Sequence, residues 1–262
     1  MEINRVYCED CRDTMARMPD EYIDLTVTSP PYDNLRTYKN NIDKVWGEHI
    51  WKLVIEGLYR VTKKGGVVVW VVGDATIKGS ETGTSFRQAL YFKEVGFNLH
   101  DTMIYTKGGQ GATGSNRSYW QDFEYMFIFS KDNLTTFNPI KDRKNKTKPG
   151  SKIERSGHRH KTGEVKERRV ICRNEFGKRF NVWQYHETGT RNVHPAVFPE
   201  QLVNDHIISW SNEGDLIYDP FMGSGTTAKM ALLNRRNWIG SEISFEYCEL
   251  INDRIRFIKK ED

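Results

Sequence analysis

Two successive prolines, Pro30 and Pro31, lie just after a β-branched run that is typical of a buried strand, Ile23–Thr28. The two prolines forbid a helix, fix two backbone φ angles and remove two amide donors. The stretch therefore predicts a rigid, extended corner at the carboxyl end of a strand, where open α/β sheets place their active sites. The Ser29 hydroxyl and the Tyr32 ring suit a planar amine, which they would hydrogen-bond at its edge and stack on its face. A proline turn with a surface tyrosine is the structural alternative.

A glycine-rich segment, Asp219-Pro220-Phe221-Met222-Gly223-Ser224-Gly225-Thr226-Thr227, follows a second predicted strand at residues 216–218. Gly223 and Gly225 allow the backbone to turn tightly into a predicted helix at 226–235 and allow a ligand to approach closely. The segment is not a Walker loop, because the Gly-Lys-Ser/Thr ending is absent. It is not the dinucleotide fingerprint either, because the third glycine is missing.

Two acidic residues end predicted strands elsewhere in the chain. Glu242 ends a strand predicted at 238–242, at the distance from the glycine-rich segment where a carboxylate can accept both hydroxyls of a ribose. Asp10 follows a strand predicted at 4–7, and a turn or helix-cap role is its structural alternative. Both acids are therefore candidate ligand-binding residues.

Strand-like and helix-like segments alternate along most of the chain, which indicates an α/β fold with helices on both faces of a mostly parallel, twisted sheet. The 262 residues suit one large domain, with room for an inserted lobe. The other predicted strands are 67–72, 97–105 and 123–129, and the other predicted helices are 14–18, 46–61, 85–95 and 200–211.

Apolar residues recur at helical spacing in residues 46–61 and in a further predicted helix near the end of the sequence. Residues 46–61 place tryptophans on the apolar face, so we expect these rings to pack in the core rather than to stack on a base. Gly65-Gly66 is expected to end this helix. The helix that begins at Ser244 is expected to bury Phe245, Cys248, Ile251 and Ile255.

Positive charge is concentrated in one part of the chain. Residues 141–180 hold 15 Lys and Arg against 5 Asp and Glu, whereas the remainder holds 24 against 30. A concentrated basic region on an otherwise acidic chain is the electrostatic footprint of polyanion binding, although a solvated basic loop has the same composition. The surrounding polar, periodicity-poor sequence extends this region to 131–185. We therefore expect a nucleic-acid-contacting insertion at 131–185, between two halves of one domain at 1–130 and 186–262.

The four cysteines do not form a disulfide framework at this chain length, so a reducing cytoplasm is expected. Cys8 and Cys11 form a lone CxxC without a second ligand pair, which favours ordinary packing over zinc, and no metal site is predicted. No apolar run approaches the roughly 20 residues of a membrane span, and no signal peptide is expected, because the first residues lack the apolar region of such a peptide. Residues 107–116 also contain several glycines, and this loop is either a plain linker or a segment with a DNA-contacting or lid role.

With these motifs in place, the chain resembles the amino-methylating DNA methyltransferases that use S-adenosylmethionine. Thr28-Ser29-Pro30-Pro31-Tyr32 is similar to the catalytic motif of the family, and the glycine-rich segment that begins at Asp219 is similar to its cofactor loop. His194-Pro195-Ala196-Val197-Phe198-Pro199 is similar to the His-Pro segment that precedes this loop. In the β group of this family, the catalytic motif comes first, the variable region next and the cofactor loop last, which is the order in this chain. Where family members often have Gly-Asp near the N-terminus, this chain has Glu9-Asp10.

The resemblance implies a Rossmann-like methyltransferase fold that is circularly permuted, with residues 131–185 as the target-recognition region. It also implies a cytoplasmic protein of a prokaryote or phage, as a monomer or a homodimer, with S-adenosylmethionine as cofactor and double-stranded DNA as substrate. The resemblance also implies a cognate restriction endonuclease that acts on the same DNA site, with no direct contact between the two proteins. The implied catalytic residues are Ser29, Pro30, Pro31 and Tyr32. The implied cofactor-binding residues are Asp10, Thr28, His194, Phe198, Pro199, Asp219, Pro220, Phe221, Gly223, Ser224, Gly225, Thr226 and Glu242.

Ser29 distinguishes the classes of amine that such an enzyme methylates. Many adenine enzymes of the family have Asp or Asn at this position, so Ser29 resembles the cytosine-N4 subgroup. Adenine-N6 methylation is the alternative enzyme reading, and a catalytically silent DNA- or RNA-binding module is the alternative from another class. Methylation of a cytosine ring carbon needs a Pro-Cys nucleophile, and none of the four cysteines follows a proline.

Overall fold

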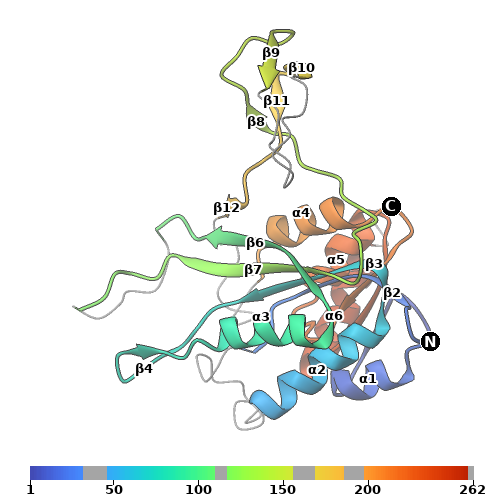
Figure 1. Cartoon of the computed structure of the whole chain (residues 1–262). Coiled ribbons are helices and arrows are strands. Elements are labelled where there is room, and N and C mark those ends of the chain that lie inside the picture. The colour runs from blue at the N-terminus through green and yellow to red at the C-terminus, as the bar shows by residue number, and fades with distance from the viewer. Residues whose placement is uncertain (32–45, 110–116, 156–168, 186–197, 259–262) are drawn as a thin grey trace. The chain divides into compact units, whose positions relative to one another are not determined.

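The computed structural model of the protein describes residues 1–31, 46–109, 117–155, 169–185 and 198–258 (Figure 1). The chain divides into two compact units, one formed by Met1–Asn138 with Asn181–Asp262 and the other by Pro139–Phe180. No described helix is both long and apolar enough to cross a membrane.

The larger unit is built on one sheet, which has eight strands within the described residues. Neighbouring strands run parallel except at β7, which is antiparallel to both of its neighbours. The sheet is therefore mostly parallel, as the alternating pattern of the sequence predicts. The strand order is β1 (Arg5–Tyr7), β14 (Asn237–Ser241), β13 (Leu216–Asp219), β2 (Ile23–Thr28), β3 (Thr62–Val72), β7 (Phe123–Ser130), β6 (Asn98–Thr106) and β12 (Val182–Gln184).

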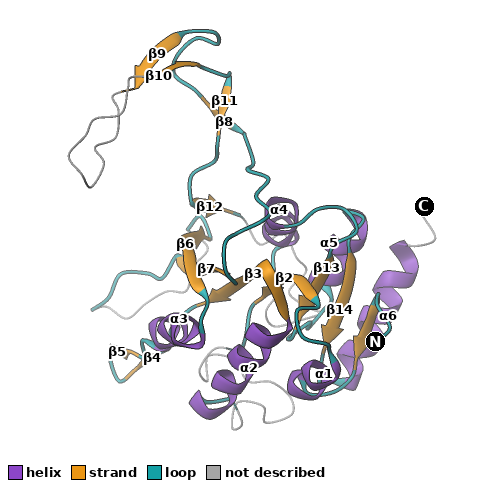
Figure 2. Cartoon of the chain, turned by 45° about the vertical axis from the view of Figure 1, so that its right-hand side comes forward, coloured by secondary structure: helices purple, strands orange, loops and turns teal. Residues whose placement is uncertain are grey.

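Helices cover both faces of this sheet (Figure 2). Residues 67–72 of β3 are buried without alternation, which is the pattern of a strand covered on both sides. One layer contains α1 (Cys11–Arg17), α2 (Glu48–Val61) and α3 (Thr84–Val95), and the other contains α4 (Glu200–Trp210), α5 (Thr226–Leu233) and α6 (Phe245–Ile258). A small ribbon of β4 (Thr76–Ile77) and β5 (Ser80–Glu81) lies outside the sheet.

Aromatic side chains fill the core between the sheet and α2 and α3. Phe92 of α3 stacks on Phe129 of β7 with 4.0 Å between ring centroids, and Trp70 of β3 meets Phe92 edge-on at 5.2 Å. Trp51 of α2 is 2% exposed, which confirms that this tryptophan is a core residue. Trp46 lies just before α2, is partly buried and packs against the core.

The expectation that Gly65-Gly66 ends a helix is wrong. Helix α2 ends at Val61, and Thr62 caps it by hydrogen-bonding the Leu58 carbonyl through its backbone N–H and its hydroxyl. The two glycines lie inside β3 instead. A Cβ atom on Gly66 would lie 2.9 Å from the Asp24 carbonyl oxygen of the neighbouring strand, so the glycine serves the close approach of two backbones.

The expected burial of Phe245 is also wrong, because this side chain is 67% exposed. Phe245 is the first residue of α6 and lies off the stripe that faces the sheet. The helix buries Cys248, Ile251 and Ile255, which follow one another at helical spacing, as expected.

The smaller unit carries the concentrated positive charge of the chain, because residues 141–180 fall within it. Its described residues form two short antiparallel ribbons, β8 (Arg143–Lys144) with β11 (Phe176–Gly177) and β9 (Lys152–Arg155) with β10 (Arg169–Cys172). The Arg179 Nε donates to an Asp142 carboxylate oxygen at 2.8 Å, and the Arg143 guanidinium lies 4.6 Å from the Phe180 ring centroid. Strand β12, which the sequence places in the predicted 131–185 region, pairs with β6 of the main sheet.

A buried histidine in α4 makes the fold sensitive to acid. His206 is fully buried, accepts a hydrogen bond on Nδ1 from Trp210 at 3.3 Å, and burial lowers its pKa to about 3. As the pH falls below about 6.5, the His206 imidazole therefore becomes protonated in the unfolded chain while it stays neutral in the folded chain. We expect the free energy of unfolding to fall by about 2 kcal/mol between pH 6.5 and pH 5 through this residue. Urea titrations of the wild type and of His206→Gln at both pH values measure it, and an equal pH dependence of the two proteins would contradict it.

Candidate functional site

The two predicted motifs meet at one edge of the sheet. Strand β13 lies parallel to β2, with Tyr218 opposite Thr26, so the carboxyl ends of both strands lie side by side (Figure 2). The Thr28 hydroxyl donates a hydrogen bond to the Asp219 carboxylate at 2.7 Å. Segments that are 191 residues apart in the sequence are thereby joined where both strands end. This edge is where open α/β sheets bind ligands.

Asp219 fixes the start of the glycine-rich segment at residues 219–227, which is the predicted cofactor loop and is called the glycine-rich loop from here on. Its carboxylate is buried and accepts hydrogen bonds from the Thr227 hydroxyl at 2.7 Å and from the Phe221 backbone N–H at 3.0 Å, in addition to the one from Thr28. Burial raises the pKa of Asp219 to about 6, and the hydrogen bonds oppose this rise. The carboxylate therefore holds β2, the loop and the first turn of α5 together.

The raised pKa predicts how Asp219 affects stability. The folded chain binds this proton more tightly than the unfolded chain, so the contribution of Asp219 to stability falls as the pH rises from about 4 to about 6. Asp219→Asn removes the titrating group and keeps a carbonyl acceptor. We expect the free energy of unfolding of the variant, relative to that of the wild type, to be about 1–2 kcal/mol higher at pH 6.5 than at pH 4.5. Denaturant titrations at both pH values measure this, and a constant difference between the proteins would contradict it.

The glycine-rich loop turns on two backbone conformations that favour glycine. Gly223 has a φ of 53°, and Gly225 has a φ of 81° at the N-cap of α5. A Cβ atom on Gly225 would lie 3.0 Å from the Ile251 side chain. The Thr226 hydroxyl is buried, and none of the described residues hydrogen-bonds it. The loop therefore offers a close backbone approach, a helix N-terminus and one unsatisfied hydroxyl to a ligand.

Glu242 lies against this loop, directly after β14. One carboxylate oxygen accepts the Gly223 backbone N–H at 2.8 Å, and the other accepts the Ser244 backbone N–H at 2.8 Å. Burial raises the pKa of Glu242 above its ordinary value. Each oxygen of a carboxylate has a second lone pair. The orientation of the carboxylate is therefore fixed while it keeps acceptor capacity for the hydroxyls of a ribose.

Asp10 follows the next strand along the same edge. Strand β1 lies parallel to β14, with Tyr7 opposite Ser241, and the Glu242 N–H donates to the Tyr7 carbonyl at 3.1 Å. Asp10 is the N-cap of α1 and accepts the backbone N–H of Arg12 at 2.8 Å. The Arg12 side chain also bonds this carboxylate and holds its pKa below the ordinary value. The helix-cap role is therefore present, and contact of Asp10 with the cofactor stays a prediction.

The predicted catalytic segment follows β2 at this edge. Pro30 is buried, and Ser29 and Pro31 are half-buried. Tyr32 and His194 lie outside the described residues. The remaining predicted residues of the cofactor site lie around the loop or at the start of α4, namely Phe198, Pro199, Pro220 and Ser224.

Other residues support the loop and carry no motif that the sequence could reveal. Arg254 of α6 donates to the Ser224 carbonyl at 2.7 Å and also pairs with the Glu200 carboxylate. Glu200 in turn accepts two hydrogen bonds from Lys229 of α5, at 2.7 and 2.9 Å. These contacts join three helices to the loop. Trp46 packs edge-on against Phe221 of the loop, with 5.2 Å between ring centroids.

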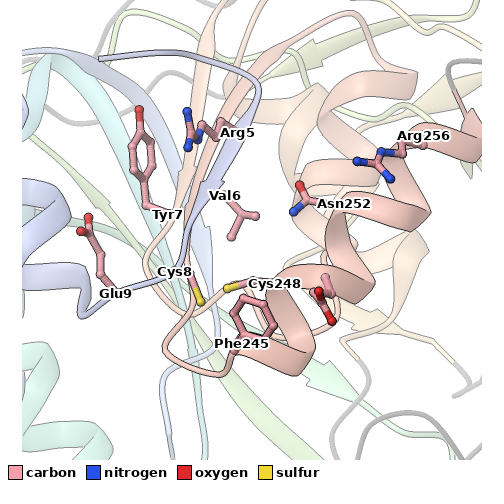
Figure 3. Close-up of a pocket in the computed structure, with 10 residues that line it drawn as sticks. Arg5, Val6, Tyr7, Cys8, Glu9, Phe245, Cys248, Asn252 and Arg256 are labelled. Carbon is pink, nitrogen blue, oxygen red and sulfur yellow. The ribbon is translucent and has the colours of Figure 1, made fainter.

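A separate cavity lies between β1 and α6 (Figure 3). The Cys8 and Cys248 side chains point toward each other in it, and burial raises the pKa of the Cys248 thiol. None of the predicted catalytic or cofactor-binding residues lines this cavity. Within the described residues, no group of His, Cys, Asp and Glu is arranged to hold a metal ion.

Comparisons with known proteins agree with this geometry. A family model of DNA methylases matches residues 23–253. The orphan methyltransferase M.BamHII of Bacillus amyloliquefaciens is 56% identical over 245 residues, which cover 89% of each chain.

Among solved structures, the PvuII DNA methyltransferase (cytosine-N4-specific) superimposes with a TM-score of 0.70 at 20% identity, covering 95% of this chain and 85% of that one. The M1.HpyAVI–SAM complex has a TM-score of 0.64 at 20% identity and covers 96% and 98%. These structures confirm the predicted methyltransferase fold. The chain belongs to the N6/N4 family of DNA methylases and is a DNA methyltransferase with S-adenosylmethionine as its cofactor.

Proposed function

We propose that this enzyme transfers a methyl group to the exocyclic N4 amine of cytosine in double-stranded DNA. The observation that carries the proposal is Ser29, which follows the catalytic strand β2 in the position where many adenine enzymes of the family have Asp or Asn. The PvuII enzyme, which is named cytosine-N4-specific, has the same fold. That fold suits either amine, so the choice of cytosine rests on Ser29.

The residues after β2 address the poor reactivity of a nucleobase amine, whose lone pair is delocalised into the ring. The Ser29 hydroxyl and the Pro30 carbonyl accept hydrogen bonds from the amine, so that its nitrogen becomes more tetrahedral. Pro31 has no N–H and stiffens the segment that presents these acceptors. Tyr32 stacks on the base. Positioning of the amine and exclusion of water supply most of the acceleration, and no covalent intermediate is needed.

The residues around the glycine-rich loop fit S-adenosylmethionine. Glu242 keeps lone pairs for the ribose hydroxyls, and the Thr226 hydroxyl lies buried without a described partner beside Gly225. Asp219 holds this loop beside the catalytic segment through Thr28. When bound, the cofactor supplies an electrophilic methyl group on its sulfonium. The role of these residues is to orient that group toward the amine at the end of β2.

A base inside a duplex is out of reach of this edge, so the target base must flip out of the stack. The excess positive charge of the Pro139–Phe180 unit suits contacts with phosphates, which position the duplex without reading its sequence. We propose that this unit also carries the target recognition of the enzyme.

The test is methyl transfer from labelled S-adenosylmethionine to mixed-sequence double-stranded DNA, followed by digestion to nucleosides and mass spectrometry. N4-methylcytosine is the expected product. N6-methyladenine would keep the fold and the cofactor but overturn the reading of Ser29. If no DNA is methylated and calorimetry detects no cofactor binding, the chain is a catalytically silent binding module.

A further inference from the structure

The turn between β6 and β7 leaves the sheet at the same edge as the catalytic segment. Thr28 at the end of β2 lies opposite Trp70 of β3, and Val72 at the end of β3 lies opposite Tyr125 near the start of β7. Because β7 is antiparallel to β3, the residues that precede Phe123 emerge where β2 and β3 end. Figure 1 shows the chain before β7 extending outward from the sheet.

Two large aromatic side chains are exposed in this stretch. Tyr119 has a relative exposure of 101%, the highest of the described large hydrophobic residues, and Trp120 is 67% exposed. Exposed apolar rings next to one another mark an interaction surface. Tyr and Trp offer a large, rigid contact area with a polar end, which suits an interface that is partly wet.

The base of this turn is held firmly. The Lys107 ammonium pairs with the Glu124 carboxylate at 2.8 Å, and both side chains are largely buried. The Lys107 N–H donates to the Asp122 carbonyl at 2.9 Å, and the Gly109 N–H donates to the Asp122 side chain at 2.7 Å. Phe123 packs edge-on against Tyr125 at 5.3 Å between ring centroids. The two exposed rings therefore project from a supported base.

We propose that Tyr119 and Trp120 form an aromatic wedge that enters the DNA base stack beside the target and occupies the space that the flipped base leaves. This proposal rests on the proposed base flipping. A duplex that loses a base from its stack gains a gap with two exposed base faces, and every base has a face on which an aromatic ring can stack. Proteins that bind the minor groove of DNA likewise insert apolar side chains between base steps. Tyr119 and Trp120 are positioning residues, since they do not touch the reacting amine.

Once sequencing of the methylated DNA has located a target site of the wild-type enzyme, the experiment compares two duplexes that carry this site. In one, the target base is correctly paired, and in the other it lies opposite an abasic site, so that flipping is already favoured. Single-turnover methylation by the Tyr119→Ala/Trp120→Ala variant is expected to be about 10- to 100-fold slower than wild type on the paired duplex. On the abasic duplex the rate is expected to return to within about threefold of wild type, because the wedge is no longer needed.

Phe257→Ala is the matched control, because Phe257 is a 69% exposed aromatic residue on α6. This variant is expected to behave as wild type on both duplexes. Full activity of the double variant on the paired duplex, or equal loss on both duplexes, would overturn the wedge. A loss accompanied by a changed sedimentation coefficient would also overturn it, since the rings would then belong to a protein interface. Absence of DNA methylation by the wild type would instead count against the proposed function.

Discussion

Replacement of Ser29 by alanine is expected to slow methyl transfer by about 10²- to 10³-fold while the affinity for S-adenosylmethionine changes less than about threefold. The hydroxyl is proposed to accept a hydrogen bond from the reacting amine, and this bond strengthens as the nitrogen becomes tetrahedral. An interaction that strengthens in the transition state affects kcat rather than cofactor binding. Single-turnover rates on DNA, together with calorimetry of the cofactor, separate the two effects.

Ser80→Ala provides the control for this substitution, because Ser80 is exposed on β5, outside the main sheet. Its methylation rate is expected to equal that of the wild type. If Ser29→Ala retained the wild-type rate, the hydroxyl would have no part in the reaction. In that case the assignment of cytosine, which depends on Ser29, would lose its support.

Replacement of Glu242 by alanine is expected to weaken S-adenosylmethionine binding by about 100-fold or more. The change removes the proposed ribose contact and leaves the Gly223 and Ser244 backbone amides without their acceptor. Hydrogen bonds to a charged group contribute about 1.5–3 kcal/mol each, and a lost factor of 100 corresponds to about 2.7 kcal/mol. Isothermal titration calorimetry of the cofactor measures the loss directly.

Glu249→Ala on α6 is the matched control, because it removes an exposed carboxylate from the helix that follows β14 in the chain. Glu242→Gln should bind the cofactor with intermediate affinity, since it keeps one carbonyl acceptor. Wild-type affinity of Glu242→Ala would show that the ribose is bound elsewhere.

Local patterns in the sequence predict most of this fold. The β-branched run Ile23–Thr28 is observed as a strand with those bounds, and the alternating segment before Thr106 is observed as β6. These signals are short-range, because strand and helix periodicity depends on neighbouring residues. The placement of Gly65-Gly66 failed because the sequence does not show that the backbone of Asp24 lies against Gly66.

Sequence motifs predict the candidate site, whereas the hydrogen bonds that hold the site in place join segments that are distant in the sequence. The motifs include both Thr28 and Asp219, but the hydrogen bond that joins them requires that β2 and β13 be neighbours. Arg254 contacts Ser224 and Glu200 across helices and belongs to no motif. Periodicity assigned Phe245 to the buried stripe, yet its position at the first turn of α6 leaves it exposed.

The attachment of the Pro139–Phe180 unit bears on how such enzymes diversify. On one side, the Asn138 N–H donates to the Ser209 carbonyl of α4, and on the other, the Ile104 N–H donates to the Asn181 carbonyl beside β12. Both anchor residues lie in the larger unit, and their side chains add bonds to the Ser211 and Thr102 carbonyls, so the anchors do not depend on the sequence of the segment between them. An exchange of the stretch between these two points would replace the whole smaller unit and leave the main sheet intact. With target recognition in this unit, as proposed above, a lineage with this architecture would acquire a new DNA target by replacing one continuous stretch of its gene.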